Sequence, residues 1–115
     1  MKIVPKGPEA ARLRQRKHQL MRRYAIPADL LPGSLRQARR RCGKPNCHCA
    51  QGEGHPIWFL TFMVEGERRI ERIPHDWVEE VQRRVNAGRA YKDTVAEALA
   101  ANAQLLVLWR RQSGR

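Results

Sequence analysis

The sequence predicts an α+β fold: an N-terminal helix, a three-stranded antiparallel sheet and two C-terminal helices. The strongest signal is the run Ile57–Val64 (IWFLTFMV), whose β-branched and aromatic content is typical of a buried strand. Glu65–Glu67 form a turn signal, and Arg68–Ile73 return as a second strand. A chain of 115 residues has room for one modest core. We therefore expect a basic flexible tail at residues 1–7 and a single domain over 8–115.

A third strand is needed because an isolated hairpin is marginally stable in water. Ser34–Arg41 is the sizeable candidate. Leu35, Ala38 and Cys42 would also fit a helical stripe, so the pattern itself is ambiguous. The need for a partner strand favours the strand.

Helices are predicted on both sides of the sheet. Pro8 and Glu9 suit a first helical turn, and the apolar positions from Ala10 to Tyr24 follow one stripe beside basic residues. After Pro74, Asp76 and Glu79 have capping spacing for a helix that Gly88 would end. A last helix is expected from Tyr91 or Thr94 to Arg111. One face of it carries Tyr91, Val95, Leu99, Asn102, Leu106 and Trp109.

Three cysteines lie within eight residues, which excludes a disulfide framework and indicates a reduced compartment. With His55 they give the spacing C-x4-C-x-C-x5-H in a Gly- and Pro-containing loop, as a metal loop requires. The predicted ligands of a structural zinc ion (Zn²⁺) are Cys42, Cys47, Cys49 and His55. His48 is the alternative fourth ligand, although its place between Cys47 and Cys49 should direct it away from the metal. Three reduced cysteines without metal are the other interpretation.

Positive charge is concentrated in the first half of the chain. The formal net charge is +12, of which residues 1–50 carry +11 and residues 51–115 carry +1. Such a local field attracts polyanions, and phosphate backbones are the commonest cytosolic polyanion, so we expect DNA or RNA as the partner. A solubilising basic surface is the alternative. The predicted nucleic-acid contacts are Arg12, Arg16, Arg23, Arg36, Arg39, Arg40, Arg41 and Lys44.

The aromatic residues of the strand offer little base recognition in this interpretation. We expect Trp58, Phe59 and Phe62 in the core, which leaves a binding mode dominated by the phosphate backbone.

Other function classes receive less support. No nucleophile, carboxylate cluster or open metal position is evident, His75 and Asp76 suit a helix start, and C-x-C lacks a redox fold context, so no enzyme is predicted. The final helix is more apolar than one core face requires. A terminal helix that closes its own core is one interpretation, and the other is a homodimer or other protein interface. Its residues are Asn102, Leu105, Leu106 and Trp109. Because the chain lacks a signal-peptide pattern and a membrane-length apolar run, we expect a cytoplasmic protein without membrane contact.

The motif residues also carry a family resemblance. Pro32–Leu35, the arginine run, the CGKPNCHC segment at 42–49 and Gly54–Pro56 look like a bacterial family known only as a domain of unknown function. The resemblance spans about residues 26–110 and departs at His55–Pro56, where the family often has an intervening glycine. It implies a zinc-knuckle-like site and an association with transposases and other mobile elements, and it implies no activity.

Overall fold

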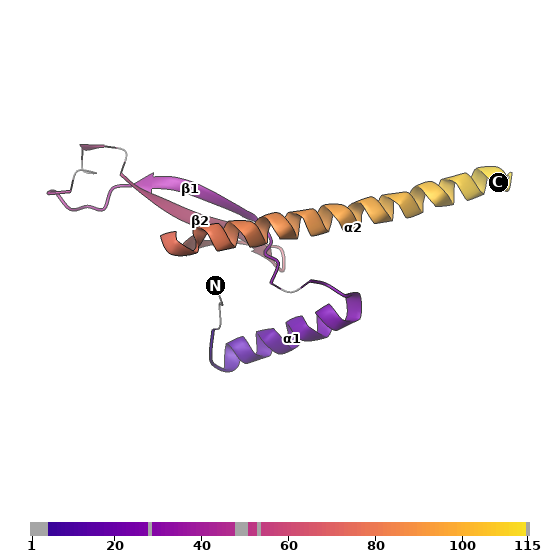
Figure 1. The fold of residues 1–115 in the computed structure, drawn as a ribbon, viewed down its shortest axis with the longest axis horizontal. Coiled ribbons are helices and arrows are strands. Elements are labelled where there is room, and N and C mark those ends of the chain that lie inside the picture. Colours follow the sequence, from indigo (N-terminus) through magenta and orange to yellow (C-terminus); the bar gives the residue numbers. More distant parts are fainter. Residues whose placement is uncertain (1–4, 28, 48–50, 53, 115) are drawn as a thin grey trace. The chain divides into compact units, whose positions relative to one another are not determined.

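A computed structural model describes residues 5–27, 29–47, 51–52 and 54–114. The chain divides into two compact units, residues 1–30 and 31–115 (Figure 1). The first contains helix α1, and the second contains the sheet and a long C-terminal helix. The α+β prediction is therefore confirmed in its main elements.

Helix α1 spans Pro8–Tyr24, as the sequence predicts. Pro8 begins the helix without a loss of hydrogen bonding, since the first helical N–H groups have no intrahelical acceptor. The helix ends at Ala25, which adopts a left-handed conformation (φ 52°). Arg12, Arg16 and Arg23 are exposed, and the Arg23 guanidinium lies 5.5 Å from the centroid of the Tyr24 ring.

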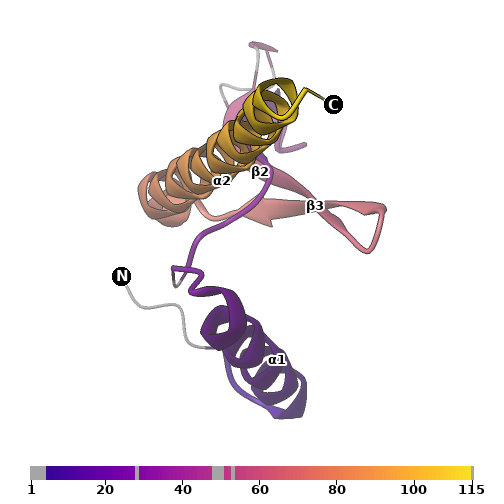
Figure 2. The same ribbon diagram turned by 90° about the vertical axis from the view of Figure 1, so that its right-hand side faces the viewer.

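The sheet has three antiparallel strands in the order β1-β2-β3. They span Ser34–Arg40, His55–Val64 and Glu67–Ile73. The ambiguous 34–41 segment is thus a strand, and β2 begins two residues earlier than the hydrophobic run. Figure 2 shows the hairpin of β2 and β3. Its two turn residues, Glu65 and Gly66, both have positive φ, as a tight two-residue hairpin turn requires.

The core lies between one face of this sheet and helix α2, which spans Val78–Gln112. Leu60, Val81 and Val85 are its buried hydrophobic residues in the described part of the chain. Leu31, Leu35, Phe62 and Ile73 pack against them. Phe62 meets the expectation of a core residue, whereas Phe59 does not: side chains alternate along a strand, so Phe59 lies on the opposite face from Leu60.

The C-terminal segment is one long helix, so the prediction of two helices is wrong. A short 3₁₀ turn at His75–Trp77 (η2) leads directly into α2, and Asp76 provides no side-chain cap. Thr94, one of the two expected starts of the last helix, lies inside α2, and its hydroxyl donates a hydrogen bond to the Ala90 carbonyl at 2.8 Å.

The two-helix prediction is wrong because Gly88 does not end a helix. It lies inside α2, at a close contact with the Leu31 backbone. A Cβ at position 88 would lie 2.3 Å from the backbone oxygen of Leu31. Glycine therefore lets the Leu31 backbone approach the helix, where the Leu31 N–H also donates to the Arg84 carbonyl at 3.2 Å. A glycine signal read from the sequence does not distinguish a helix end from a close backbone approach.

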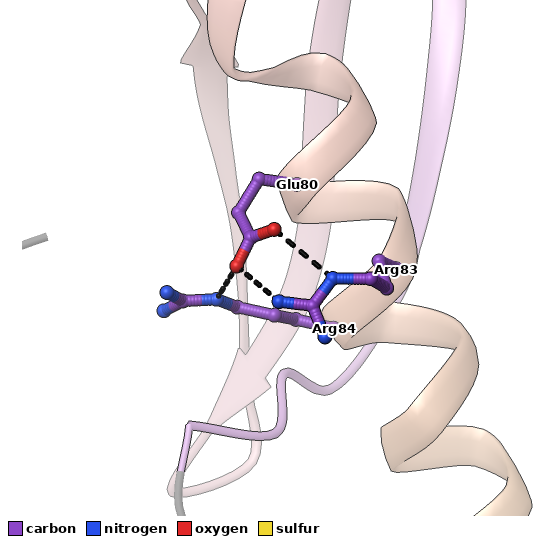
Figure 3. Close-up of polar contacts among 3 residues, drawn as sticks. All are labelled: Glu80, Arg83 and Arg84. Carbon is purple, nitrogen blue, oxygen red and sulfur yellow. Dashed lines mark hydrogen bonds and ion pairs between the residues drawn. The ribbon is translucent and has the colours of Figure 1, made fainter. Parts of the chain in front are cut away.

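An ion-pair cluster reinforces the first turns of α2 (Figure 3). Arg83 and Arg84 both donate to the carboxylate of Glu80, through Nε atoms at 3.0 Å in each case. These hydrogen bonds lower the pKa of Glu80 to about 2, so the carboxylate remains ionised at neutral pH. The cluster balances the charge of Arg84, whose side chain is 15% exposed.

Beyond the sheet, α2 continues as an exposed helix (Figure 1). Leu99, Leu106 and Trp109 are 63%, 62% and 69% exposed. Despite this apolar content, none of the described helices has the length and hydropathy needed to cross a membrane.

Candidate metal centre

The pairing of β1 with β2 brings the two ends of the cysteine loop together. Arg40, the last residue of β1, pairs with His55, the first residue of β2. The loop of residues 41–54 joins them at one end of the sheet. His55 therefore lies beside Cys42 although twelve residues of sequence lie between them.

Three predicted metal ligands meet at this end of the sheet. The thiol sulfurs of Cys42 and Cys47 and a ring nitrogen of His55 all lie within 4.8 Å of one another. Cys47 Sγ is 3.2 Å from His55 Nε2. In a tetrahedral site with metal–sulfur bonds of about 2.3 Å and a metal–nitrogen bond of about 2.0 Å, the ligand atoms are about 3.5–3.8 Å apart. The cluster has the donor types and spacing to hold a metal ion.

Hydrogen bonds hold both arms of this loop. The Cys47 N–H donates to the Lys44 carbonyl at 3.2 Å, which closes a tight turn before the second sulfur. On the returning arm, the Gly52 carbonyl accepts from Arg41 Nε at 2.9 Å and the Gly54 carbonyl accepts from Arg39 at 3.3 Å. The positions of the donor atoms are thus supported by the backbone around them.

Gly54 is required where the returning arm crosses the end of β1. Its φ is +96°, and a Cβ there would lie 2.4 Å from the carbonyl carbon of Arg40. Only glycine accommodates both the dihedral angle and the approach. This turn of the backbone lets His55 reach Cys42 and Cys47.

Cys49 and His48 lie outside the described residues. The structure brings His55, the preferred histidine, into the cluster, and Cys49 stays the predicted fourth ligand. Three sulfurs and one imidazole would complete a closed tetrahedral site.

The predicted nucleic-acid contacts fall into separate groups. Arg12, Arg16 and Arg23 belong to α1, in the unit of residues 1–30. Arg36 and Arg40 are exposed on one face of β1. Arg39 lies on the other face, and Arg39 and Arg41 both donate hydrogen bonds to backbone carbonyls of the cysteine loop. Lys44 is exposed within that loop.

Sequence reasoning missed two arginines that the sheet places on the same face as Arg36 and Arg40. Arg72 pairs with Phe59, which in turn pairs with Arg36, and Arg68 lies on the same face of β3. The signal was present in the sequence: the two-residue turn at Glu65–Gly66 fixes the register of β3, and alternation then assigns each β3 residue to a face.

A comparison with protein families places the chain in one of them. Residues 10–83 match the family described as Domain of unknown function (DUF6788), and the chain belongs to this family. The match begins earlier and ends earlier than the expected range of residues 26–110. It includes most of α1, the whole sheet, the cysteine loop and the start of α2. Searches of curated proteins and of solved structures found no match.

The first prediction concerns the metal. We expect one metal ion per chain, and Cys47→Ser should remove it and destabilise the fold, because metal binding is coupled to folding. A loss of at least about 2 kcal/mol in the free energy of unfolding would lower Tm by roughly 8–16 °C. Metal analysis and thermal unfolding measure both effects.

A pair of histidine variants provides the control. His55→Ala should release metal readily, whereas His48→Ala should retain it. A metal-free wild-type chain that unfolds at the same temperature as the metal-loaded chain would contradict the prediction.

Proposed function

We propose that this protein is a small zinc-binding protein that binds DNA or RNA, mainly through the phosphate backbone. The observation that carries the proposal is the joining of a metal-ligand cluster to a strand rich in arginine. Cys42 follows β1 by two residues, and Arg36 and Arg40 lie on that strand. A metal at this position would fix the end of β1, which carries these cations.

Zinc is the metal that the donor set favours. Two thiolates and an imidazole suit zinc, whereas magnesium and calcium prefer oxygen ligands. With Cys49 as the fourth ligand, no coordination position would stay open for a substrate. The role of zinc in the proposal is therefore structural, and the function is binding without catalysis.

The concentration of charge supports a polyanionic partner. Residues 1–50 carry a net charge of +11, and the arginines of β1 and the neighbouring loop are exposed. Arginine suits this role because its planar guanidinium donates two parallel hydrogen bonds to phosphate. The resemblance described above suggests that the protein acts as an accessory factor of a mobile element in the cytoplasm.

The second prediction concerns the salt dependence of binding. Affinity for a duplex should fall steeply between about 50 and 200 mM salt, because each phosphate contact releases counterions. Replacing Arg39, Arg40 and Arg41 together by alanine should weaken binding to all sequences alike and flatten the salt dependence. Fluorescence anisotropy at several salt concentrations measures both quantities.

The matched control removes three positive charges elsewhere, with Arg69, Arg110 and Arg111 replaced by alanine. It should change the affinity much less. The metal content of both variants is measured as well, since Arg39 and Arg41 also donate hydrogen bonds to the cysteine loop. Absence of binding at low salt, or binding that salt does not weaken, would refute the proposal.

A second candidate function is protein assembly through the end of α2. Val81, Val85 and Gly88 are buried, and the same alternating spacing of four and three residues continues beyond the sheet. The continuation is exposed and comprises Lys92, Val95, Leu99, Asn102, Leu106 and Trp109. Such spacing is typical of a coiled-coil seam, and a single asparagine within it suits pairing with the asparagine of a second copy. Leu105 is exposed beside this seam.

The third prediction tests this candidate by the oligomeric state. Wild-type protein should sediment as a dimer at tens of micromolar, and Leu106→Glu should sediment as a monomer, because a carboxylate at the seam opposes burial. Gln104→Glu, at an exposed position off the seam, is the control and should leave the dimer intact. A monomeric wild-type protein at this concentration would remove the homodimer from consideration.

A further inference from the structure

The two faces of the sheet differ sharply in charge. On the face that packs against α2, the charged strand residues are Arg39, Arg69, Glu67 and Glu71, and their formal charges sum to zero. On the other side, called here the outer face, they are Arg36, Arg40, Arg68 and Arg72, a charge of +4 without any acidic residue. The outer face is formed by even-numbered residues of β1 and β3 and odd-numbered residues of β2, since directly paired residues share a face.

An aromatic side chain lies at the centre of the outer face. Phe59 of β2 pairs with Arg36 on one side and Arg72 on the other. It is partly exposed, and it belongs to the face opposite to the α2 contact. Neighbouring strands are about 4.8 Å apart, so both guanidinium groups are within reach of a molecule stacked on the ring.

The two remaining arginines lie diagonally opposite each other on the sheet, beyond the neighbouring residues Arg36, Phe59 and Arg72. Arg40 lies four residues from Arg36 on β1, beside His55 at the metal end. Arg68 lies four residues from Arg72 on β3, beside Met63 at the hairpin end. Four residues of strand span about 13 Å and two strand spacings about 10 Å, so the path of the cations from Arg40 to Arg68 measures roughly 28 Å in a straight line from end to end, with Phe59 at its middle.

The exposed apolar residues of the outer face lie along the same path. Met63 is 58% exposed and Ile70 is 55% exposed. A surface whose only requirement is solubility has no reason to combine exposed apolar side chains, an aromatic ring and cations of one sign. This combination matches the ligand chemistry of a flexible polyanion that also carries flat apolar groups.

We propose that the outer face of the sheet binds single-stranded nucleic acid. The phosphates lie along Arg40, Arg36, Arg72 and Arg68, and an unpaired base stacks on Phe59. A duplex suits this surface less well, because its bases are stacked on one another and do not present a free ring face to Phe59. The charge complementarity and the central aromatic residue favour this occupant over a protein partner, whose surface would need to be strongly acidic.

This inference rests on the proposed nucleic-acid binding. It adds the location of the binding site, a preference for single-stranded nucleic acid, and three contact residues, which are Arg68, Arg72 and Phe59. It also links the metal centre to the site, since His55 is both a residue of the outer face and a member of the metal-ligand cluster.

The experiment measures the affinity of the metal-loaded full chain for a fluorescein-labelled oligothymidylate of about 12 nucleotides, a length in the range of known single-strand sites. Arg72→Gln should weaken binding and reduce the salt slope by about 0.7, the value for one phosphate contact of a single strand. Phe59→Leu should weaken binding about fivefold or more at every salt concentration and leave the salt slope unchanged, because it removes stacking without a change in charge. An unlabelled duplex of equal length should compete less well than the unlabelled single strand.

Arg69→Gln is the matched control. Arg69 is exposed on the same strand, and the change in charge is identical, but it lies on the face toward α2. Its affinity should stay within about twofold of the wild type, since it removes no proposed phosphate contact. Thermal unfolding of each variant verifies the fold, and Arg72→Gln keeps the test decisive if Phe59→Leu lowers stability.

The possible outcomes separate this inference from the proposal on which it rests. Weaker binding by Arg72→Gln and Phe59→Leu, with Arg69→Gln unchanged, supports the outer face as the site. Equal effects of Arg72→Gln and Arg69→Gln, or a preference for the duplex, would overturn the outer-face site while nucleic-acid binding stands. Absence of binding to either oligonucleotide would overturn both.

Discussion

The pairing of β1 with β2 in one register is the constraint on which the rest of the structure depends. Leu35 opposite Leu60 supplies part of the core against α2, and Arg40 opposite His55 gathers the metal ligands. Arg36 opposite Phe59 places a cation beside an aromatic ring on the outer face. A shift of one residue would exchange the two faces of β1. The core, the metal cluster and the proposed binding face would then all be lost together.

The small core explains why such a register benefits from a metal. In the described part of the chain, three hydrophobic residues are buried, and each contributes on the order of 1.5–3 kcal/mol. Small domains with so little buried apolar surface usually need a further stabilising element. The metal-ligand cluster lies at the His55 end of β2, five residues from the buried Leu60, and a bound ion would hold that end of the sheet closed.

The sequence was sufficient for the features that depend on local patterns. Apolar and β-branched content predicted β2 and β3, and the weakness of an isolated hairpin indicated β1. The spacing of cysteines and histidine predicted a cluster, of which the structure brings Cys42, Cys47 and His55 close enough to hold a metal ion. It was insufficient where a residue acts through a tertiary contact. Gly88 looks like a helix end until the Leu31 backbone is seen against it, and Phe59 looks like a core residue until α2 is seen on the other face. In the same way, Arg68 and Arg72 lie outside the basic region of residues 1–50, and only the pairing of β3 with β2 brings them to the outer face.

The central claim is that a metal-held strand register, and not positive charge alone, creates the nucleic-acid site. The most direct measurement compares the affinity of the chain for a single-stranded oligonucleotide before and after removal of the metal by a chelator. The chain keeps every lysine and arginine in both states, so the net charge from these side chains stays constant. Our account predicts a loss of affinity of at least about tenfold with a smaller salt slope, because aligned phosphate contacts are lost, and recovery when Zn²⁺ is restored. Equal affinity and an equal salt slope in the two states would contradict it.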